Sequence, residues 1–305
     1  MSPSRVAARR LFLTQTLALA SVTASGLTAG SAQAIEPIGR DRSKFKFSLA
    51  AYSYRSLLQG ERPKLTLNDF VDDCAKFGLE GTELTSYYFA PDVTDDQLRS
   101  LKRHCFRQGL DVSGTAIGND FGHLEAEKHA EQIRLTKRWI DRAAVLGAPV
   151  IRIFAGHQHD GADAEQTHRQ MVAGIEECCD YAGQHGVHLA LENHGGPTAT
   201  AAGLLRFVQD VKSDWFGVNM DTGNFHSADV YAELEQIAPY ALNVQVKVTV
   251  TGPDGTKRPT DWQRIATILK QANYQGYVVL EFEEAGDPRV ECERYLDVLR
   301  SALRE

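Results

Sequence analysis

The chain has 305 residues, of which 43% are hydrophobic, and a formal net charge of −7 at pH 7. This acidic balance argues against nucleic-acid binding, because proteins that bind nucleic acids present basic surfaces to the phosphates. The five cysteines are an odd number and show none of the spacings of a disulfide scaffold or a zinc ribbon. We therefore expect mostly buried thiols.

The first 34 residues have the features of a removable export signal. Arg9 and Arg10 precede an apolar stretch that ends in Ala32-Gln33-Ala34, an A-x-A cleavage signature. The paired arginines predict a twin-arginine signal and a periplasmic protein; a Sec signal and an uncleaved anchor are the alternatives. The stretch is too short and too polar for a stable membrane span. Loss of the three arginines in this signal would lower the net charge from −7 to −10.

After a short segment at 35–44, short apolar, β-branched segments alternate with longer amphipathic ones through residues 45–305, and eight such pairs can be counted. The expected strands lie at 46–52, 80–84, 111–116, 149–154, 187–191, 216–220, 242–247 and 277–281. No linker separates the two halves. This pattern predicts a single (β/α)8 TIM barrel. A doubly wound sheet is the alternative, but neither G-x-G-x-x-G nor a P-loop follows the first strand.

Active sites of TIM barrels lie where strands end and βα loops begin, so the polar residues at these positions are the candidates. They are Tyr52, Arg55, Glu83, Thr85, Asn119, Asp120, His123, His157, His159, Glu192, Asn193, His194, Asp221, Asn224, His226, Gln245, Lys247, Glu281 and Glu283. Five of the ten histidines therefore fall on one face of the barrel.

Three of these candidates are carboxylates that close apolar strands: Glu192, Asp221 and Glu281. A half-buried carboxylate is costly to leave without a partner. A salt bridge to a neighbouring strand would explain any one of them. Three together, with no arginine expected nearby and with the amide oxygen of Gln245 between them, predict a bound divalent cation.

Several segments resemble the xylose-isomerase-like TIM-barrel superfamily of sugar isomerases and epimerases, over about residues 45 to 305. The segments are 191–194 (LENH), 221–224 (DTGN), 246–247 (VK) and 277–283 (YVVLEFE). Segments 83–88 (ELTSYY) and 119–121 (NDF) are similar to its secreted bacterial branch. The order and spacing of these motifs together carry the resemblance.

The resemblance implies that Glu192, Asp221 and Glu281 bind Mn²⁺ or Mg²⁺ beside a fourth ligand from the seventh strand. Gln245 stands where the family usually has His. An amide oxygen in place of a nitrogen makes the predicted donor set all oxygen, which favours Mg²⁺ or Mn²⁺ over Zn²⁺.

In the epimerase relatives, two glutamates on opposite sides of the sugar are both metal ligands and acid/base catalysts, which implies these roles for Glu192 and Glu281. The chemistry would be proton abstraction next to a carbonyl through a metal-stabilised enediolate. Proton return to the other face gives epimerisation, and return to the neighbouring carbon gives isomerisation. The candidates for sugar binding are His157, His159, His194, Asn224 and Lys247.

Three alternatives remain open at this point. An exported protein could instead cleave 3-keto-glycosides as a lyase or hydrolase at the same site. A non-catalytic sugar-binding protein would not need the aligned acids. A relative of the abasic-site endonucleases would need more histidines and a basic face for DNA, and this chain is acidic. The sequence gives no indication of the oligomeric state.

Overall fold

The structure of the protein is a computed structural model that describes residues 34–39 and 41–304. The predicted export signal at 1–34 lies outside the described residues except for its last position, so export stays a prediction. Within the described ranges, no helix is long and apolar enough to cross a membrane. The five cysteines are all buried and free, as the sequence predicts.

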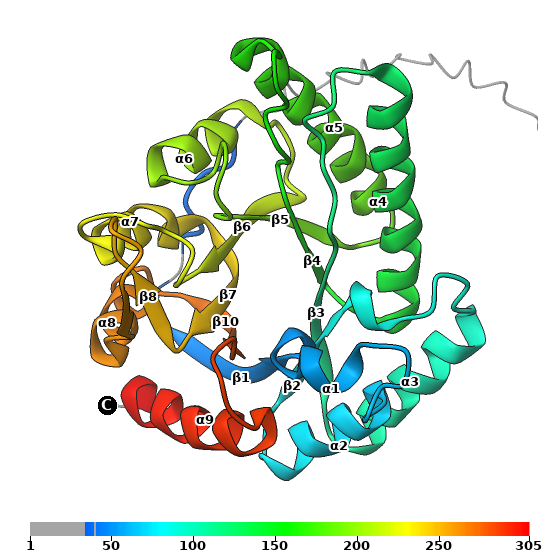
Figure 1. Cartoon of the computed structure of the whole chain (residues 1–305), viewed down its shortest axis with the longest axis vertical. Coiled ribbons are helices and arrows are strands. Elements are labelled where there is room, and N and C mark those ends of the chain that lie inside the picture. Colours follow the sequence, from blue (N-terminus) through cyan, green and yellow to red (C-terminus); the bar gives the residue numbers. More distant parts are fainter. Residues whose placement is uncertain (1–33, 40, 305) are drawn as a thin grey trace, which may run out of the picture. The chain divides into compact units, whose positions relative to one another are not determined.

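Eight parallel strands close into a barrel, which confirms the predicted TIM-barrel fold (Figure 1). They are β1 (Lys44–Ala50), β2 (Gly81–Thr85), β3 (Asp111–Ala116), β4 (Val150–Ile153), β5 (His188–Glu192), β6 (Phe216–Asp221), β7 (Ala241–Lys247) and β10 (Gln275–Glu281). Every strand overlaps its predicted segment, and the ends differ by at most two residues. The order around the barrel is β1-β10-β7-β6-β5-β4-β3-β2.

Helices surround the barrel on its outside (Figure 1). They are α2 (Leu67–Lys76), α3 (Asp95–Arg107), α4 (Ala126–Leu146), α5 (Ala164–Gln184), α6 (Ala201–Asp210), α7 (Val230–Ile237), α8 (Trp262–Gln271) and α9 (Pro288–Arg304), with a short α1 (Arg55–Leu58) after β1. Thr66 and Thr94 begin α2 and α3 with capping boxes, in which the Thr side chain and the third helical residue satisfy each other's backbone amides.

A two-stranded hairpin that the sequence did not predict follows β7. Its strands are β8 (Thr249–Thr251) and β9 (Lys257–Pro259). They are three residues each, too short to show a clear alternation of apolar and polar residues. The hairpin lies at the same end of the barrel as the carboxyl end of β7, because it continues directly from that strand.

The strand register brings the predicted site residues together at one end of the barrel. Glu192 pairs with Asn219, Asp221 with Gln245, and Glu281 with Lys247. Residues that pair between neighbouring strands point to the same face of the sheet. These side chains therefore share the inner face at the carboxyl ends of β5, β6, β7 and β10.

The inside of the barrel is polar, and the hydrophobic core lies between the strands and the helices. Gln245 donates a hydrogen bond of 2.6 Å to Glu83, although β7 and β2 are not neighbours in the barrel. A contact between these two strands has to cross the lumen. The alternate residues of β7, such as Val244 and Val246, are fully buried in the core cluster. This strict alternation leaves the inner face free for polar groups.

Candidate active site at the mouth of the barrel

Glu192 ends β5 and has two polar partners in a buried position. Its Oε2 lies 2.8 Å from Nε of Arg152, and its Oε1 accepts a hydrogen bond of 2.7 Å from Asn224. The expectation that no arginine lies near the carboxylates was therefore wrong. Arg152 is 93% buried in the apolar strand β4. Alternation along this strand turns its side chain toward the lumen, between Ile151 and Ile153, which face the core.

Lys247 connects three further acids at the carboxyl end of the barrel, which we call its mouth: Asp221, Glu281 and Glu283. Its Nζ lies 2.9 Å from Glu283 and 3.4 Å from both Asp221 Oδ2 and Glu281 Oε2. Its fourth partner is Asn224, whose Oδ1 accepts a hydrogen bond of 3.1 Å. Because Asn224 also donates to Glu192, a single amide connects the ammonium of Lys247 with the carboxylate of Glu192.

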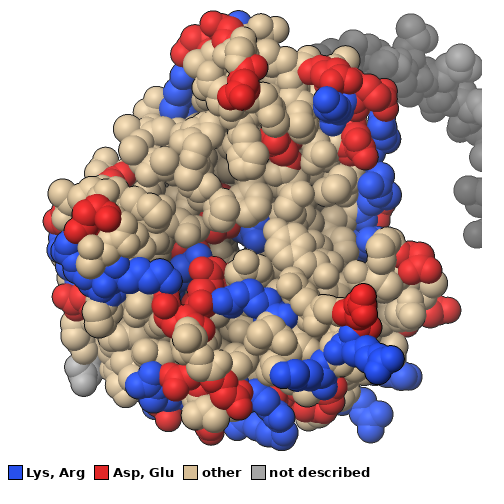
Figure 2. Space-filling model, viewed as in Figure 1, with Lys and Arg blue, Asp and Glu red and all other residues tan. Residues whose placement is uncertain are grey.

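The acids in this mouth outnumber the bases. Of its five carboxylates, Glu192 contacts Arg152, Asp221, Glu281 and Glu283 contact Lys247, and Glu83 accepts hydrogen bonds from two amides. Figure 2 shows acidic and basic side chains around a hollow near the middle of the molecule. A buried excess of negative charge has to be neutralised by protons or by a cation.

The pKa values of the buried carboxyl groups reflect this excess. Burial, which disfavours the charged form, raises the pKa of Glu83, Glu192 and Asp221 to about 7 each. Burial also raises the pKa of Glu281, against the opposing effect of Lys247. At neutral pH these carboxyl groups can therefore both accept and donate a proton, which is the property that acid/base catalysis requires.

The mouth offers oxygen donors of the kind that suits a divalent cation, although the ligand atoms of Glu192, Asp221 and Glu281 do not all lie within 4.8 Å of one another and would have to move closer to share it. Asp221 Oδ2 is buried and accepts no hydrogen bond, whereas Glu192 Oε2 lies 2.8 Å from Nε of Arg152, so Asp221 Oδ2 is the one of these two oxygens that is left open to a cation. Carboxylate oxygens are the donors that Mg²⁺ and Mn²⁺ prefer. The ammonium of Lys247 is closer to Glu283 than to Asp221 and Glu281, so its contacts with those two acids are long, and Asp221 Oδ1 accepts a hydrogen bond of 2.8 Å from the amide of Gly223.

Gln245 lies deeper in the barrel and is held by hydrogen bonds on both sides. Its Oε1 accepts a hydrogen bond of 2.7 Å from Asn219, and its Nε2 donates a hydrogen bond of 2.6 Å to Glu83. Asn243 donates to both Glu83 and Asn219 and completes the network. A carbonyl oxygen accepts two hydrogen bonds, so Oε1 keeps one lone pair. The role of Gln245 as a ligand stays a prediction.

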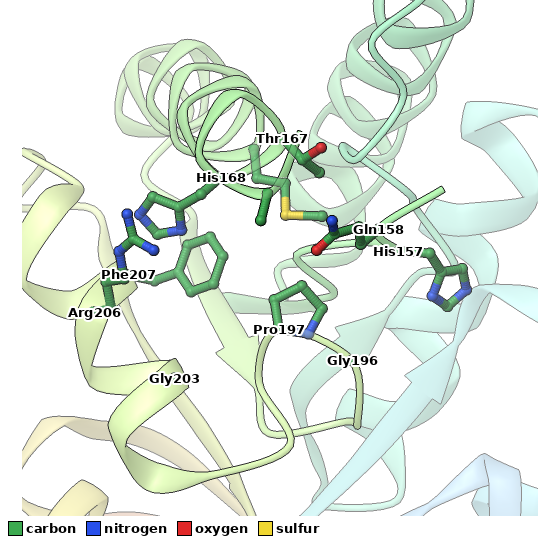
Figure 3. A pocket seen from close by; sticks show the side chains of 11 residues that line it. His157, Gln158, Thr167, His168, Gly196, Pro197, Gly203, Arg206 and Phe207 are labelled. Atoms are coloured by element: carbon green, nitrogen blue, oxygen red, sulfur yellow. The ribbon is translucent and has the colours of Figure 1, made fainter. Parts of the chain in front are cut away.

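Of the three predicted sugar-binding histidines, His194 lies near the network, because the charges of Arg152, Lys247 and Glu283 affect its pKa. His194 packs on the ring of Phe154 at 4.3 Å, and burial lowers its pKa to about 4, so this imidazole is neutral. His157 and His159 follow β4 and contact Asp120 instead of the acids of the mouth. His157 also lines a cavity of about 490 Å³ between α5 and α6, with Arg206 on the other side (Figure 3).

Comparison with known proteins agrees with this architecture. A family model described as xylose isomerase-like TIM barrel matches residues 71–302. The chain belongs to the xylose isomerase-like TIM barrel family. No curated protein matches the chain.

Solved structures share the fold of this xylose isomerase-like barrel at low sequence identity. D-psicose 3-epimerase from Clostridium cellulolyticum H10 is 18% identical, with a TM-score of 0.69 over 85% of this chain and 99% of that one. The 3-keto-D-glucoside 4-epimerase of E. coli is 17% identical, with a TM-score of 0.68 over 85% and 100% of the two chains. A xylose isomerase domain protein from Planctomyces limnophilus is 14% identical, with a TM-score of 0.65 over 87% and 98%.

The polar network beneath the site of this xylose isomerase-like barrel should contribute to its stability. Glu83 is 1% exposed and accepts hydrogen bonds from Gln245 and Asn243. In Glu83→Leu both amide donors lose this acceptor, which costs about 1–3 kcal/mol per donor. Urea unfolding should show a lower free energy of unfolding for Glu83→Leu. The decrease should be smaller for Glu83→Gln, which keeps one acceptor oxygen. A Glu83→Leu variant as stable as the original chain would show that this polar network does not contribute to stability.

Stability should also depend on pH in a direction set by the raised pKa values. The carboxyl of Glu192 has a usual pKa of 4.5 and one of about 7 in the fold, so between these values the folded chain holds a proton that the unfolded chain has lost. Glu192 and Asp221 therefore lower the free energy of unfolding as the pH rises from about 5 to 7.

This dependence can be measured by urea unfolding of chelator-treated protein across that pH range. His194, whose pKa burial lowers to about 4, gives a slope of opposite sign between about pH 4 and 6.5, so the contribution of Glu192 is read as the difference in unfolding free energy between the parent chain and Glu192→Gln. Addition of Mn²⁺ at pH 8 should raise the melting temperature, because the cation binds the ionised acids of the folded state only. A difference between the parent chain and Glu192→Gln that does not fall from pH 5 to 7, or a metal-free protein that Mn²⁺ leaves unchanged at pH 8, would contradict this.

Proposed function

We propose that the protein is a carbohydrate epimerase or isomerase that moves a proton at a carbon next to a carbonyl group. The observation that carries this proposal is the pair of buried glutamates, Glu192 and Glu281. They end β5 and β10, which are separated in the barrel by β6 and β7, so the two carboxyl groups approach the mouth from different sides. Their pKa values are both raised toward neutrality by burial. One group can remove a proton while the other supplies one.

The other residues of the mouth are suited to hold the substrate and its developing charge. Lys247 places an ammonium beside Glu281, where it can stabilise negative charge on a sugar oxygen. Arg152 holds Glu192 in place through its contact at 2.8 Å. Asn224 forms hydrogen bonds with both Glu192 and Lys247 and so links the two groups of residues. These fixed polar groups require no rearrangement as charge develops in the transition state.

We propose Glu192, Asp221, Glu281 and Gln245 as the residues that hold a divalent cation in this mouth. Bound Mg²⁺ or Mn²⁺ would polarise the carbonyl group of the sugar and stabilise the negative charge that develops on its oxygen. The buried Oδ2 of Asp221, which accepts no hydrogen bond, supports this proposal.

The structural relatives support the choice of substrate class. Two of them are named for epimerisation of D-psicose and of a 3-keto-D-glucoside. Both names describe sugars that carry a carbonyl group beside the carbon where a proton can be abstracted. We propose a keto sugar or a keto-glycoside as the substrate of this chain as well.

A lyase acting on 3-keto-glycosides is the second candidate. After proton removal by a glutamate, the electron pair can expel a glycosidic oxygen at the next carbon, and the leaving oxygen needs a proton. The ammonium of Lys247 lies 3.4 Å from Glu281 and could supply that proton. A cleaved aglycone would distinguish this reaction from epimerisation.

Incubation of the metal-loaded protein in D₂O with free ketoses and 3-keto-glycosides, followed by NMR of the products, tests the proposal. Deuterium next to the carbonyl of an intact sugar is the result expected for an epimerase or isomerase. Loss of the aglycone would assign the lyase reaction. Neither product, with saturating metal and bound sugar, would overturn the catalytic proposal in favour of a sugar-binding protein.

A further inference from the structure

A second group of possible metal ligands lies outside the acid network of the mouth. Asp120 and His123 belong to the loop after β3, and His159 belongs to the loop after β4. One ligand atom of each residue lies within 4.8 Å of the others, and within residues 34–39 and 41–304 this is the only such group of three His, Cys, Asp or Glu residues. Nε2 of His159 and of His123 lie 3.1 and 3.6 Å from Asp120 Oδ2.

The carboxylate of Asp120 is fixed by the backbone. Its Oδ1 accepts hydrogen bonds of 2.9 Å from the amides of Gly122 and His157, one from each loop. Oδ2 is thereby directed at the two imidazoles. Gly156 adopts a φ of +113°, and a Cβ at this position would lie 2.1 Å from Asp120 Oδ1. The absence of a side chain at Gly156 therefore permits this close approach of the two loops.

We propose that Asp120, His123 and His159 form a binding site for Zn²⁺ or a similar borderline cation. In a tetrahedral zinc site with bonds of about 2.0–2.1 Å, neighbouring donor atoms are about 3.3 Å apart. The two N···O distances lie on either side of this value. Two imidazoles and one carboxylate are the donor set of many zinc sites that keep one position for water.

The imidazole rings can complete the coordination by small rotations. They stack at 4.2 Å between centroids, with an angle of 16° between their planes. Their side chains are 24% and 41% exposed, so each ring is free to turn and direct its Nε2 at a shared cation. The cation would connect the loops after β3 and β4 at the end of the barrel that carries the active site.

This site differs in chemistry from the mouth of the barrel. The mouth offers carboxylate and amide oxygens, which suit Mg²⁺ and Mn²⁺, whereas imidazole nitrogens suit Zn²⁺ and Co²⁺. The two sites can therefore be occupied separately. Binding of Zn²⁺ between these loops does not depend on the reaction in the mouth of the barrel.

Titration of the purified protein with Zn²⁺ in excess Mg²⁺, followed by calorimetry, tests the site. A Glu281→Gln background removes one ligand of the mouth and isolates the loop site. We expect one Zn²⁺ per chain in this background, and affinity at least tenfold weaker after His123→Ala or His159→Ala. Co²⁺ should give a visible absorption band that the same two variants lose.

The matched control is His104→Ala. His104 lies 2.8 Å from Asp72 on a helical surface and forms an ordinary His–Asp pair, so its loss should leave Zn²⁺ affinity unchanged. Circular dichroism of each metal-free variant checks the fold. An unchanged Zn²⁺ affinity in a folded His123→Ala/His159→Ala double variant would overturn the proposal, as would complete loss of Zn²⁺ binding in the Glu281→Gln background.

Discussion

Replacement of Glu281 by Gln is expected to reduce turnover by about 100- to 10,000-fold, the usual contribution of a general acid or base. The same loss is expected for Glu192→Gln. Glutamine preserves the shape of the side chain but cannot exchange a proton with the substrate. Each variant removes one negative charge from a buried cluster with more acids than bases, but Glu192→Gln also takes the carboxylate partner from Arg152, so circular dichroism must show that each variant is folded before its activity is compared.

Turnover should be measured on the substrate identified by NMR, with metal at saturating concentration, so that weakened metal binding is separated from lost chemistry. Glu177→Gln is the matched control, because Glu177 forms a surface pair with Lys137 on α4 and α5. That variant should retain full activity. A Glu192→Gln/Glu281→Gln double variant with undiminished turnover would rule out the proposed roles.

Replacement of Arg152 by Met is expected to lower the free energy of unfolding by about 3–5 kcal/mol, since it removes one partner of a buried ion pair. Glu192, only 3% exposed, would be left without a basic neighbour at 2.8 Å. Its pKa should rise further, because Arg152 opposes the effect of burial. Activity that requires ionised Glu192 should consequently need a higher pH in the variant.

Urea unfolding at pH 8 measures the stability change, and a pH profile of turnover measures the second effect. The double variant Arg152→Met/Glu192→Met serves as the control, since removal of both charges leaves neither one buried alone. It should be more stable than Arg152→Met. A single variant that loses less than about 1 kcal/mol, the value typical of surface pairs, would show that the ion pair is not the main partner of Glu192.

The fold was predictable because its signal is repeated along the chain. Each barrel strand is a short apolar segment followed by an amphipathic helix, and eight repeats leave little choice of architecture. The polar residues that end strands were equally visible, so Glu192, Asp221 and Glu281 could be assigned to one face of the barrel before the structure was known. Their arrangement follows from the parallel register of the strands.

The contacts that the carboxylates make inside the barrel were not predictable in this way. Arg152 is a single charged residue inside the apolar segment VIRI, and nothing in the segment shows that it reaches Glu192. The contact between Glu83 and Gln245 joins residues 162 positions apart on strands that are not neighbours. The first contact depends on the register of the neighbouring strands β4 and β5, and the second on closure of the barrel, so only the folded structure shows that the carboxylates have basic and amide partners.

The central claim is that the mouth of the barrel removes a proton from a carbon next to a carbonyl group. A substrate labelled with deuterium at that carbon tests this claim most directly, through NMR of the label during turnover in ordinary water. Loss of the label to solvent, at a rate comparable with turnover and abolished in Glu192→Gln or Glu281→Gln, is the predicted result. Quantitative transfer of the label to the neighbouring carbon of the product would indicate a hydride shift and contradict it.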